Sequence, residues 1–199
     1  MTTDLHFTLD LLDRRPDLPL LADLSHYLVG REFAWPVDAQ NHALIHRILD
    51  NAWAFHGRVA SREQVQVEIS FPHYRPWLDL FLEWWDQGFR SWHSRAAGDA
   101  PLVFTCELGP KPYAITGSDG NDLSDRWSEA LQMKRLVRQL WSEVGRKPFT
   151  QRQGSGGIRA ERAAAPGAAG TGARAVARAR HLLGGAVGLY QLCQPCGRT

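Results

Sequence analysis

The pattern of hydrophobic and polar positions predicts an alternation of strands and helices along the first 145 residues. Three apolar runs have the length of buried strands in a parallel sheet. These runs are residues 18–23, 52–59 and 102–107. Each run is followed by a segment with apolar positions at helical spacing. These segments are residues 36–49, 76–97 and 124–144.

The order of these elements indicates parallel strands joined by right-handed helical crossovers. A further helix, over residues 7–15 and ended by Pro16, precedes the first strand. A closed eight-stranded barrel needs about 250 residues, whereas residues 1–145 supply three clear strands. The sequence therefore predicts an α/β fold that is either part of a (β/α) barrel or a small open sheet.

The composition changes near residue 145. All eight tryptophans lie between Trp35 and Trp141, and residues 146–199 are rich in Ala, Gly and Arg. We predict two regions: a folded domain over 1–145 and a tail over 146–199 that is disordered, irregular or partly helical. The tail also resembles an out-of-frame translation of GC-rich DNA, so a frameshift product and a genuine extension are both open.

Charge and cysteine usage restrict the partners. Residues 1–145 hold 14 Lys/Arg and 20 Asp/Glu, a net charge of −6, and residues 146–199 hold 9 Lys/Arg and one Asp/Glu, a net charge of +8. An acidic domain is disfavoured as a nucleic-acid binder. No apolar run is long enough to span a membrane, and the start of the chain does not read as a secretory signal.

The three cysteines give no disulfide framework, so we expect a reducing, cytoplasmic setting. They are Cys106, Cys193 and Cys196. The last two form a C-x-x-C pair with no second pair for a zinc ribbon. We interpret that pair as coincidental.

Three residues that can bind a metal stand at the ends of the three predicted strands: Asp23, His56 and Glu107. Ligands of parallel α/β folds bind at the carboxyl ends of strands. Two carboxylates and one imidazole suit Mn, Mg, Co or Zn. Each residue also has a simpler interpretation: the aspartate as a helix cap, the histidine as a structural residue and the glutamate as a loop residue.

Three motifs around these residues resemble the sugar phosphate isomerase/epimerase family. They are LPLLADLSHY at residues 18–27, FHGRV at 55–59 and CELGPKPY at 106–113. The resemblance covers roughly residues 5–144 and implies the C-terminal half of a xylose isomerase-like TIM barrel, about three to four βα units.

The resemblance also implies roles for individual residues. Asp23, His56 and Glu107 would be metal ligands, His26 and Arg58 would contact the substrate, and Glu107 would also be catalytic. The implied substrate is a small sugar or sugar phosphate of carbohydrate metabolism. The implied reaction moves a proton between adjacent carbons of an aldose or ketose with the help of the metal.

The family binds its metal with a fourth residue, a glutamate on an earlier strand. Residues 1–6 contain no glutamate, so we expect a truncated protein with impaired activity. A non-catalytic remnant of the family is the alternative, and an apurinic-site endonuclease-like metal hydrolase is less favoured. Open sheet edges would promote self-association.

Two further segments each have two interpretations. The aromatic residues of 76–97 predict core packing, and a carbohydrate-stacking platform is the alternative. Residues 60–75 read either as a solvated loop or, by the resemblance, as a lid over the site.

Overall fold

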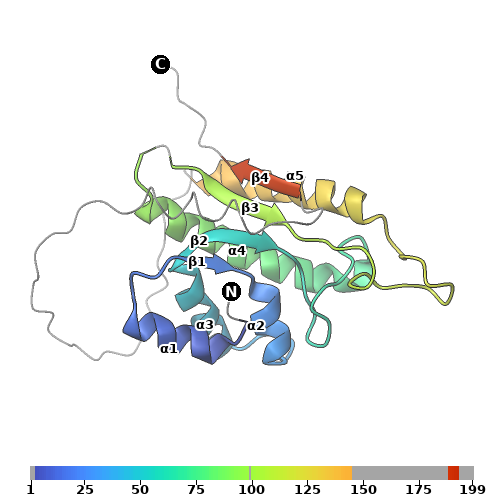
Figure 1. The fold of residues 1–199 in the computed structure, drawn as a ribbon, viewed down its shortest axis with the longest axis horizontal. Helices are drawn as coiled ribbons and strands as arrows, with labels where there is room; N and C mark the ends of the chain where they lie inside the picture. The colour runs from blue at the N-terminus through green and yellow to red at the C-terminus, as the bar shows by residue number, and fades with distance from the viewer. Residues whose placement is uncertain (1–2, 99, 145–187, 193–199) are drawn as a thin grey trace, which may run out of the picture. The chain divides into compact units, whose positions relative to one another are not determined.

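The computed structural model describes residues 3–98, 100–144 and 188–192. Strands and helices follow one another in the predicted order (Figure 1). The elements are α1 (Leu5–Arg14), β1 (Leu20–Ala22), α2 (Leu24–Gly30), α3 (Ala39–Leu49), β2 (Ala52–Gly57), the 3₁₀ helix η1 (Pro72–Tyr74), α4 (Arg75–Arg95), β3 (Leu102–Cys106), α5 (Arg126–Val144) and β4 (Gly188–Leu192).

The sheet has the strand order β1-β2-β3-β4. Strands β1, β2 and β3 are parallel, with Ala22 opposite Phe55 and His56 opposite Thr105. Because the three strands run the same way, their carboxyl ends lie along one edge of the sheet. The structure therefore confirms a mixed α/β fold around a small, open, parallel three-stranded sheet.

Strand β4 was not predicted. It pairs antiparallel with β3, with Leu102 opposite Leu192, although the sequence analysis places residues 188–192 in a disordered or partly helical tail. Pairing between strands so distant in the sequence leaves no local signal for a short strand in a Gly- and Ala-rich stretch. The rest of the tail, including Cys193 and Cys196, lies outside the described residues.

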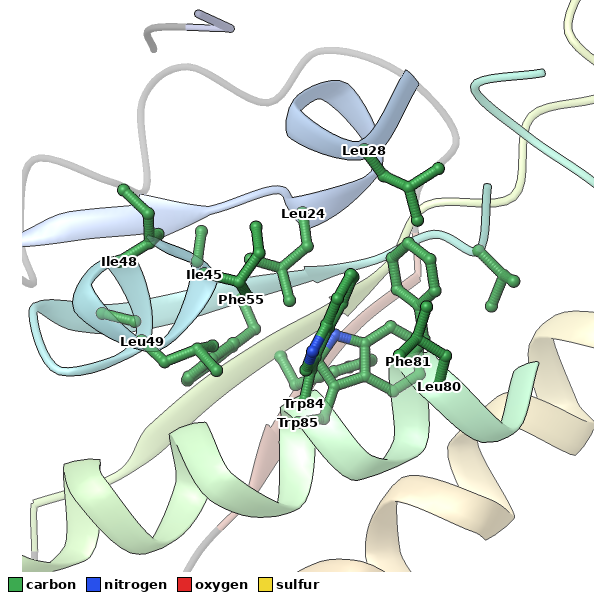
Figure 2. Close-up of a cluster of buried hydrophobic side chains, with 14 of the residues drawn as sticks. Leu24, Leu28, Ile45, Ile48, Leu49, Phe55, Leu80, Phe81, Trp84 and Trp85 are labelled. Carbon is green, nitrogen blue, oxygen red and sulfur yellow. The ribbon is translucent and has the colours of Figure 1, made fainter. Parts of the chain in front are cut away.

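Helices α3, α4 and α5 lie along one side of the sheet (Figure 1). The core forms between this layer and the strands, where α4 presents large aromatic side chains to Phe55 of β2 (Figure 2). The aromatic side chains of α4 also contact Phe104 of β3. The buried aromatic residues of α4 are Phe81, Trp84, Trp85, Phe89 and Trp92. Core packing, the favoured interpretation of this helix, is confirmed for these five residues.

Two glycines let the helices approach the sheet closely. A Cβ atom on Gly57 of β2 would lie 2.2 Å from Phe104 and 2.8 Å from Met133 of α5. A Cβ atom on Gly88 of α4 would lie 2.7 Å from Phe55. Neither position has room for a side chain, and Gly57 thereby fixes the backbone between His56 and Arg58.

Residues 24–30 form α2, which was not predicted, because a helix of 7 residues is too short to show a clear helical period. The solvated-loop interpretation of residues 60–75 is wrong for its central part, because Val67, Glu68 and Ile69 are buried. None of the helices in the described ranges is both long enough and apolar enough to span a membrane.

The first turn of α5 differs from the predicted apolar face. Trp127 is an apolar residue of the predicted helical segment 124–144, but its side chain is 63% exposed. The same turn instead directs Arg126 and Glu129 inward, where Arg126 pairs with Glu68 and Glu129 accepts a hydrogen bond from the backbone N–H of Ser70 at 2.9 Å. A buried polar network therefore replaces apolar packing at the start of the helix.

Candidate metal centre

Each parallel strand delivers one predicted site residue to the same edge of the sheet. Asp23 follows β1 and caps α2, because its Oδ1 accepts hydrogen bonds from Ser25 N at 3.2 Å and Ser25 Oγ at 2.5 Å. His56 is the penultimate residue of β2. Glu107 directly follows β3, and its backbone N–H donates to Gly57 O at 3.0 Å.

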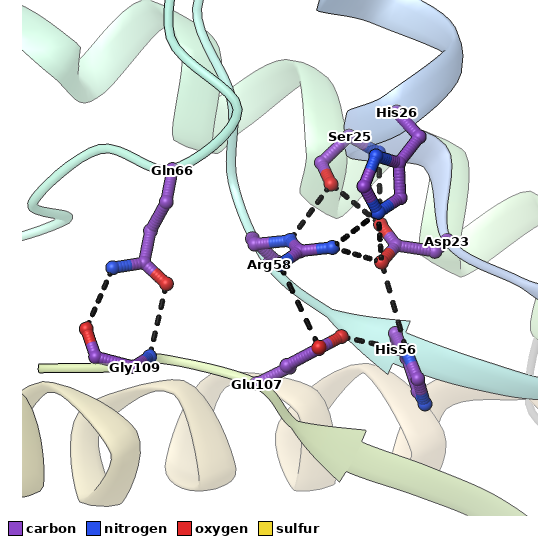
Figure 3. Close-up of polar contacts among 8 residues, drawn as sticks. All are labelled: Asp23, Ser25, His26, His56, Arg58, Gln66, Glu107 and Gly109. Carbon is purple, nitrogen blue, oxygen red and sulfur yellow. Dashed lines mark hydrogen bonds and ion pairs between the residues drawn. The ribbon is translucent and has the colours of Figure 1, made fainter. Parts of the chain in front are cut away.

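The side chains of Asp23, His56 and Glu107 converge (Figure 3). One ligand atom from each lies within 4.8 Å of the other two. His56 Nδ1 is 2.6 Å from Glu107 Oε2 and 3.6 Å from Asp23 Oδ2. The aspartate therefore serves both as a helix cap and as a member of this cluster, so its two sequence interpretations do not exclude each other.

Exposure differs among the three side chains. Asp23 is 1% and His56 6% exposed, whereas Glu107 is 27% exposed. Glu107 is therefore the most accessible to solvent of the three side chains.

Arg58 joins the cluster from just beyond β2. Its Nε donates to Ser25 Oγ at 2.9 Å, and its Nη2 donates to Asp23 Oδ2. Its Nη1 lies 3.5 Å from Glu107 Oε1. The buried guanidinium thus partly neutralises both carboxylates.

His26 forms the open side of the cluster. Its Nε2 lies 2.7 Å from Arg58 Nη2 and must accept there, since a guanidinium only donates. The ring is 27% exposed and 3.6 Å from Asp23 Oδ2. The structure thus brings together all five residues singled out from the sequence.

The donor set fits a divalent cation by a test internal to the structure. Glu107 Oε2 and both ring nitrogens of His56 are buried and make no hydrogen bond of acceptable geometry, although Nδ1 and Oε2 face each other at 2.6 Å. Buried polar atoms without partners are costly. A cation between the two carboxylates and His56 Nδ1 would satisfy Nδ1 and Glu107 Oε2. Two carboxylate oxygens and one imidazole nitrogen are a ligand set that suits Mn, Mg, Co or Zn.

The electrostatics of the cluster favour its charged forms. Burial acts to raise the pKa of Asp23, but His56, Arg58, Ser25 and His26 outweigh it and lower the pKa to about 2. Burial acts to lower the pKa of His56, but the carboxylates of Asp23 and Glu107 outweigh it and raise the pKa to about 9. Without a metal, a proton on His56 balances the two carboxylates.

Sequence reasoning missed three residues that complete this edge. Ser25 links Asp23 to Arg58. Gln66 binds both backbone groups of Gly109, with Nε2 donating to the carbonyl at 2.8 Å and Oε1 accepting from the N–H at 2.9 Å (Figure 3). Tyr113 lies with its ring centroid 6.0 Å from Arg58 Cζ. Ser25 and Tyr113 belong to the motifs at 18–27 and 106–113, so the sequence could have pointed to them. Gln66 could not be found in this way, because it bonds the backbone of Gly109, which carries no sequence signal.

Comparisons of the chain with models of protein families, with curated proteins and with solved structures found no match.

Proposed function

We propose that this chain is a divalent-metal-dependent sugar isomerase/epimerase-like domain, built as part of a xylose isomerase-like TIM barrel. The observation that carries the proposal is the convergence of Asp23, His56 and Glu107 at the carboxyl edge of three parallel strands, with one ligand atom of each within 4.8 Å of the other two. The motifs around the three residues support the same family.

The exposure of the side chains assigns their roles. Asp23 and His56 are almost completely buried and would hold the metal. Glu107 is partly exposed, so it can bind the metal through one oxygen and reach a substrate carbon with the other. His26 and Arg58 border the same space, where His26 offers an exposed ring to substrate hydroxyls.

The reaction follows from this arrangement. When bound, a divalent ion would polarise the substrate carbonyl and its neighbouring hydroxyl as a Lewis acid. Glu107 would remove the proton from the carbon next to the carbonyl and return it to the adjacent carbon on the same face. Epimerisation would need a second group on the opposite face to return the proton there. Arg58 would hold Asp23 ionised and in place through its hydrogen bond.

One observation favours a second candidate, a non-catalytic member of the same fold. Arg58 is already paired with Asp23 and lies near Glu107, so the cluster is charge-compensated without a metal. In that case the five residues would be a structural polar network. An apurinic-site endonuclease-like hydrolase gains no support from the described residues.

Two measurements separate these candidates. Calorimetric titration of the wild type with Mn²⁺ or Co²⁺ should show one site with a dissociation constant well below millimolar. Asp23→Asn, His56→Gln and Glu107→Gln should each weaken it by at least about tenfold, since each removes a ligand. Asp79→Asn is the matched control, because Asp79 is exposed and pairs only with Arg75.

The second measurement follows chemistry without knowledge of the substrate. Free aldoses and ketoses and their phosphate esters are incubated with the metal-loaded protein in D₂O, and deuterium uptake at carbon is read by NMR. Uptake that disappears in Glu107→Gln supports the isomerase/epimerase proposal. Metal binding without uptake on any sugar would favour the non-catalytic candidate, and absence of metal binding would contradict the proposal.

A further inference from the structure

The guanidinium of Arg58 is largely engaged by neighbouring side chains of the cluster. Its Nε is bonded to Ser25, its Nη2 to Asp23 and His26, and its Nη1 faces Glu107 at 3.5 Å. The side chain is only 4% exposed. A phosphate group is recognised by an accessible fork of guanidinium donors, and here that fork is engaged by internal partners.

Tyr113, unlike Arg58, is exposed to solvent. It is 57% exposed, yet it borders the charged cluster, because its ring centroid lies 6.0 Å from Arg58 Cζ. Its phenol makes a large, partly apolar surface available beside groups that bind hydroxyls. An exposed aromatic ring next to convergent polar groups is typical of sites that bind small ligands.

The loop around Tyr113 holds the ring in position. The backbone N–H of Tyr113 donates to Pro110 O at 3.0 Å. The buried side chain of Gln66 bonds both backbone groups of Gly109, which lies beside the Tyr113 ring. A loop whose backbone is held before binding loses little freedom when a ligand packs on it.

We propose that this site takes an unphosphorylated sugar that packs a carbon face on Tyr113, with Arg58 reserved as the internal counter-ion of Asp23 and Glu107. The inference rests on the proposed function and narrows it, because a sugar phosphate was equally open from the sequence. A neutral polyol presents hydroxyls to His26 and Glu107 and C–H groups to the phenol. A phosphate ester would add a dianion beside two carboxylates whose cation is already engaged.

The test uses matched pairs of sugars on the full chain loaded with Mg²⁺. D-fructose, D-tagatose and D-ribulose are each titrated beside the corresponding terminal phosphate ester, and binding is followed by saturation-transfer NMR. At least one free sugar should bind, with its phosphate ester binding no more tightly. Tyr113→Ala should weaken binding of the free sugar by about two- to tenfold, and Tyr113→Phe should stay within about twofold of wild type.

The control variant is Trp53→Leu. Trp53 is also a partly exposed aromatic residue, at 39%, but it stands at the start of β2, at the other end of the strand from His56. The substitution Trp53→Leu should therefore leave sugar binding unchanged. Circular dichroism and a metal titration on each variant establish that the fold and the metal site persist.

Each alternative outcome has its own meaning. Phosphate esters that bind tenfold more tightly than free sugars would overturn the inference and leave the proposed function standing. Free-sugar binding that is unchanged in Tyr113→Ala would also overturn it. A wild type that binds Mg²⁺ but no sugar of either kind would contradict both this inference and the proposed function.

Discussion

Two clusters in this protein place a buried arginine between two carboxylates, and they differ in how the carboxylates are held. In the metal-centre cluster, Arg58 lies between Asp23 and Glu107. In the second cluster, here called the loop clasp, Arg126 lies between Glu68 and Glu129. Both contain buried polar atoms without hydrogen-bond partners, so unsatisfied atoms alone do not distinguish them.

Backbone anchoring and exposure do distinguish them. Both acids of the loop clasp accept from backbone N–H groups of other segments: Glu68 from Ile115 at 2.8 Å and Glu129 from Ser70 at 2.9 Å. The three side chains are at most 6% exposed. The clasp therefore ties together the loops that follow β2 and β3 and the start of α5.

The metal-centre cluster has an open side instead. Glu107 and His26 are each 27% exposed, and the convergent atoms belong to side chains from three strand ends. The loop clasp, closed and anchored to the backbone, therefore has the features of a cluster that stabilises the fold. The metal-centre cluster, open and made of convergent side chains, is available to a ligand.

The largest effect should come from breaking the loop clasp. Arg126→Met leaves Glu68 and Glu129 buried without a cation, which should cost about 3–5 kcal/mol in the free energy of unfolding, measured by urea denaturation. Arg75→Met is the control, since Arg75 pairs with Asp79 at the surface and should cost at most about 1 kcal/mol. A loss similar to that of the control would show that the clasp is not structural.

The next effect concerns the backbone that carries His56 and Arg58. Gly57→Ala forces a methyl group against Phe104 and Met133, which should cost about 1–3 kcal/mol. Gly30→Ala, where the nearest atom to an added Cβ lies 3.9 Å away, is the control. Equal thermal stability of the two variants would contradict the packing described around Gly57.

An effect of similar size should sharpen the comparison by adding metal. Excess Mn²⁺ at about a hundredfold its dissociation constant should stabilise the wild type by about 2.7 kcal/mol. The gain should disappear in His56→Gln, because a ligand is lost, and persist in Glu129→Gln, because Glu129 is not one of the three converging ligand residues. Thermal denaturation with and without Mn²⁺ measures the gain in stability of each variant. If the gain were lost in Glu129→Gln but kept in His56→Gln, the metal would bind in the loop clasp, which would contradict the account.

The last effect is the pH dependence of the metal-free protein. The pKa of His56 is raised from its ordinary 6.5 to about 9, so its contribution to stability is complete below pH 6.5 and is lost as the pH rises through 9. The pKa of Asp23 is lowered from 3.8 to about 2, so its contribution is complete above pH 3.8 and is lost as the pH falls through 2.

A series of melting temperatures against pH checks these signs. His56→Gln should lack the alkaline part of the decline that the wild type shows between about pH 6.5 and 9. Metal binding near neutral pH should also release a proton from His56, which calorimetry in buffers of different ionisation enthalpy detects. An alkaline decline of the same size in the variant would show that His56 is not its source.

The elements that could be predicted from the sequence are those whose hydrophobic pattern lies within one short segment. The three parallel strands were visible as short apolar runs, and α4 was visible because its aromatic residues recur at helical spacing. Asp23, His56 and Glu107 could be singled out because each stands at a strand end, and parallel strands bring their ends to one edge.

The elements that depend on distant contacts were missed. Nothing in the sequence near Glu68 predicts that it will be buried against Arg126, which lies far along the chain. Gln66 likewise hydrogen-bonds the backbone of Gly109. Because every residue has a backbone, such a contact leaves no mark in the sequence. The fold class and the candidate metal ligands were thus accessible from sequence, whereas the clasp and the fixed loop around Tyr113 required the structure.

The central claim is that Asp23, His56 and Glu107 share one divalent cation. An anomalous difference map from crystals grown with Mn²⁺ tests it most directly. The account predicts a single strong peak at about 2.0–2.3 Å from an oxygen of each carboxylate and a ring nitrogen of His56. No peak at this position, with the Arg58 guanidinium remaining between the carboxylates, would contradict it.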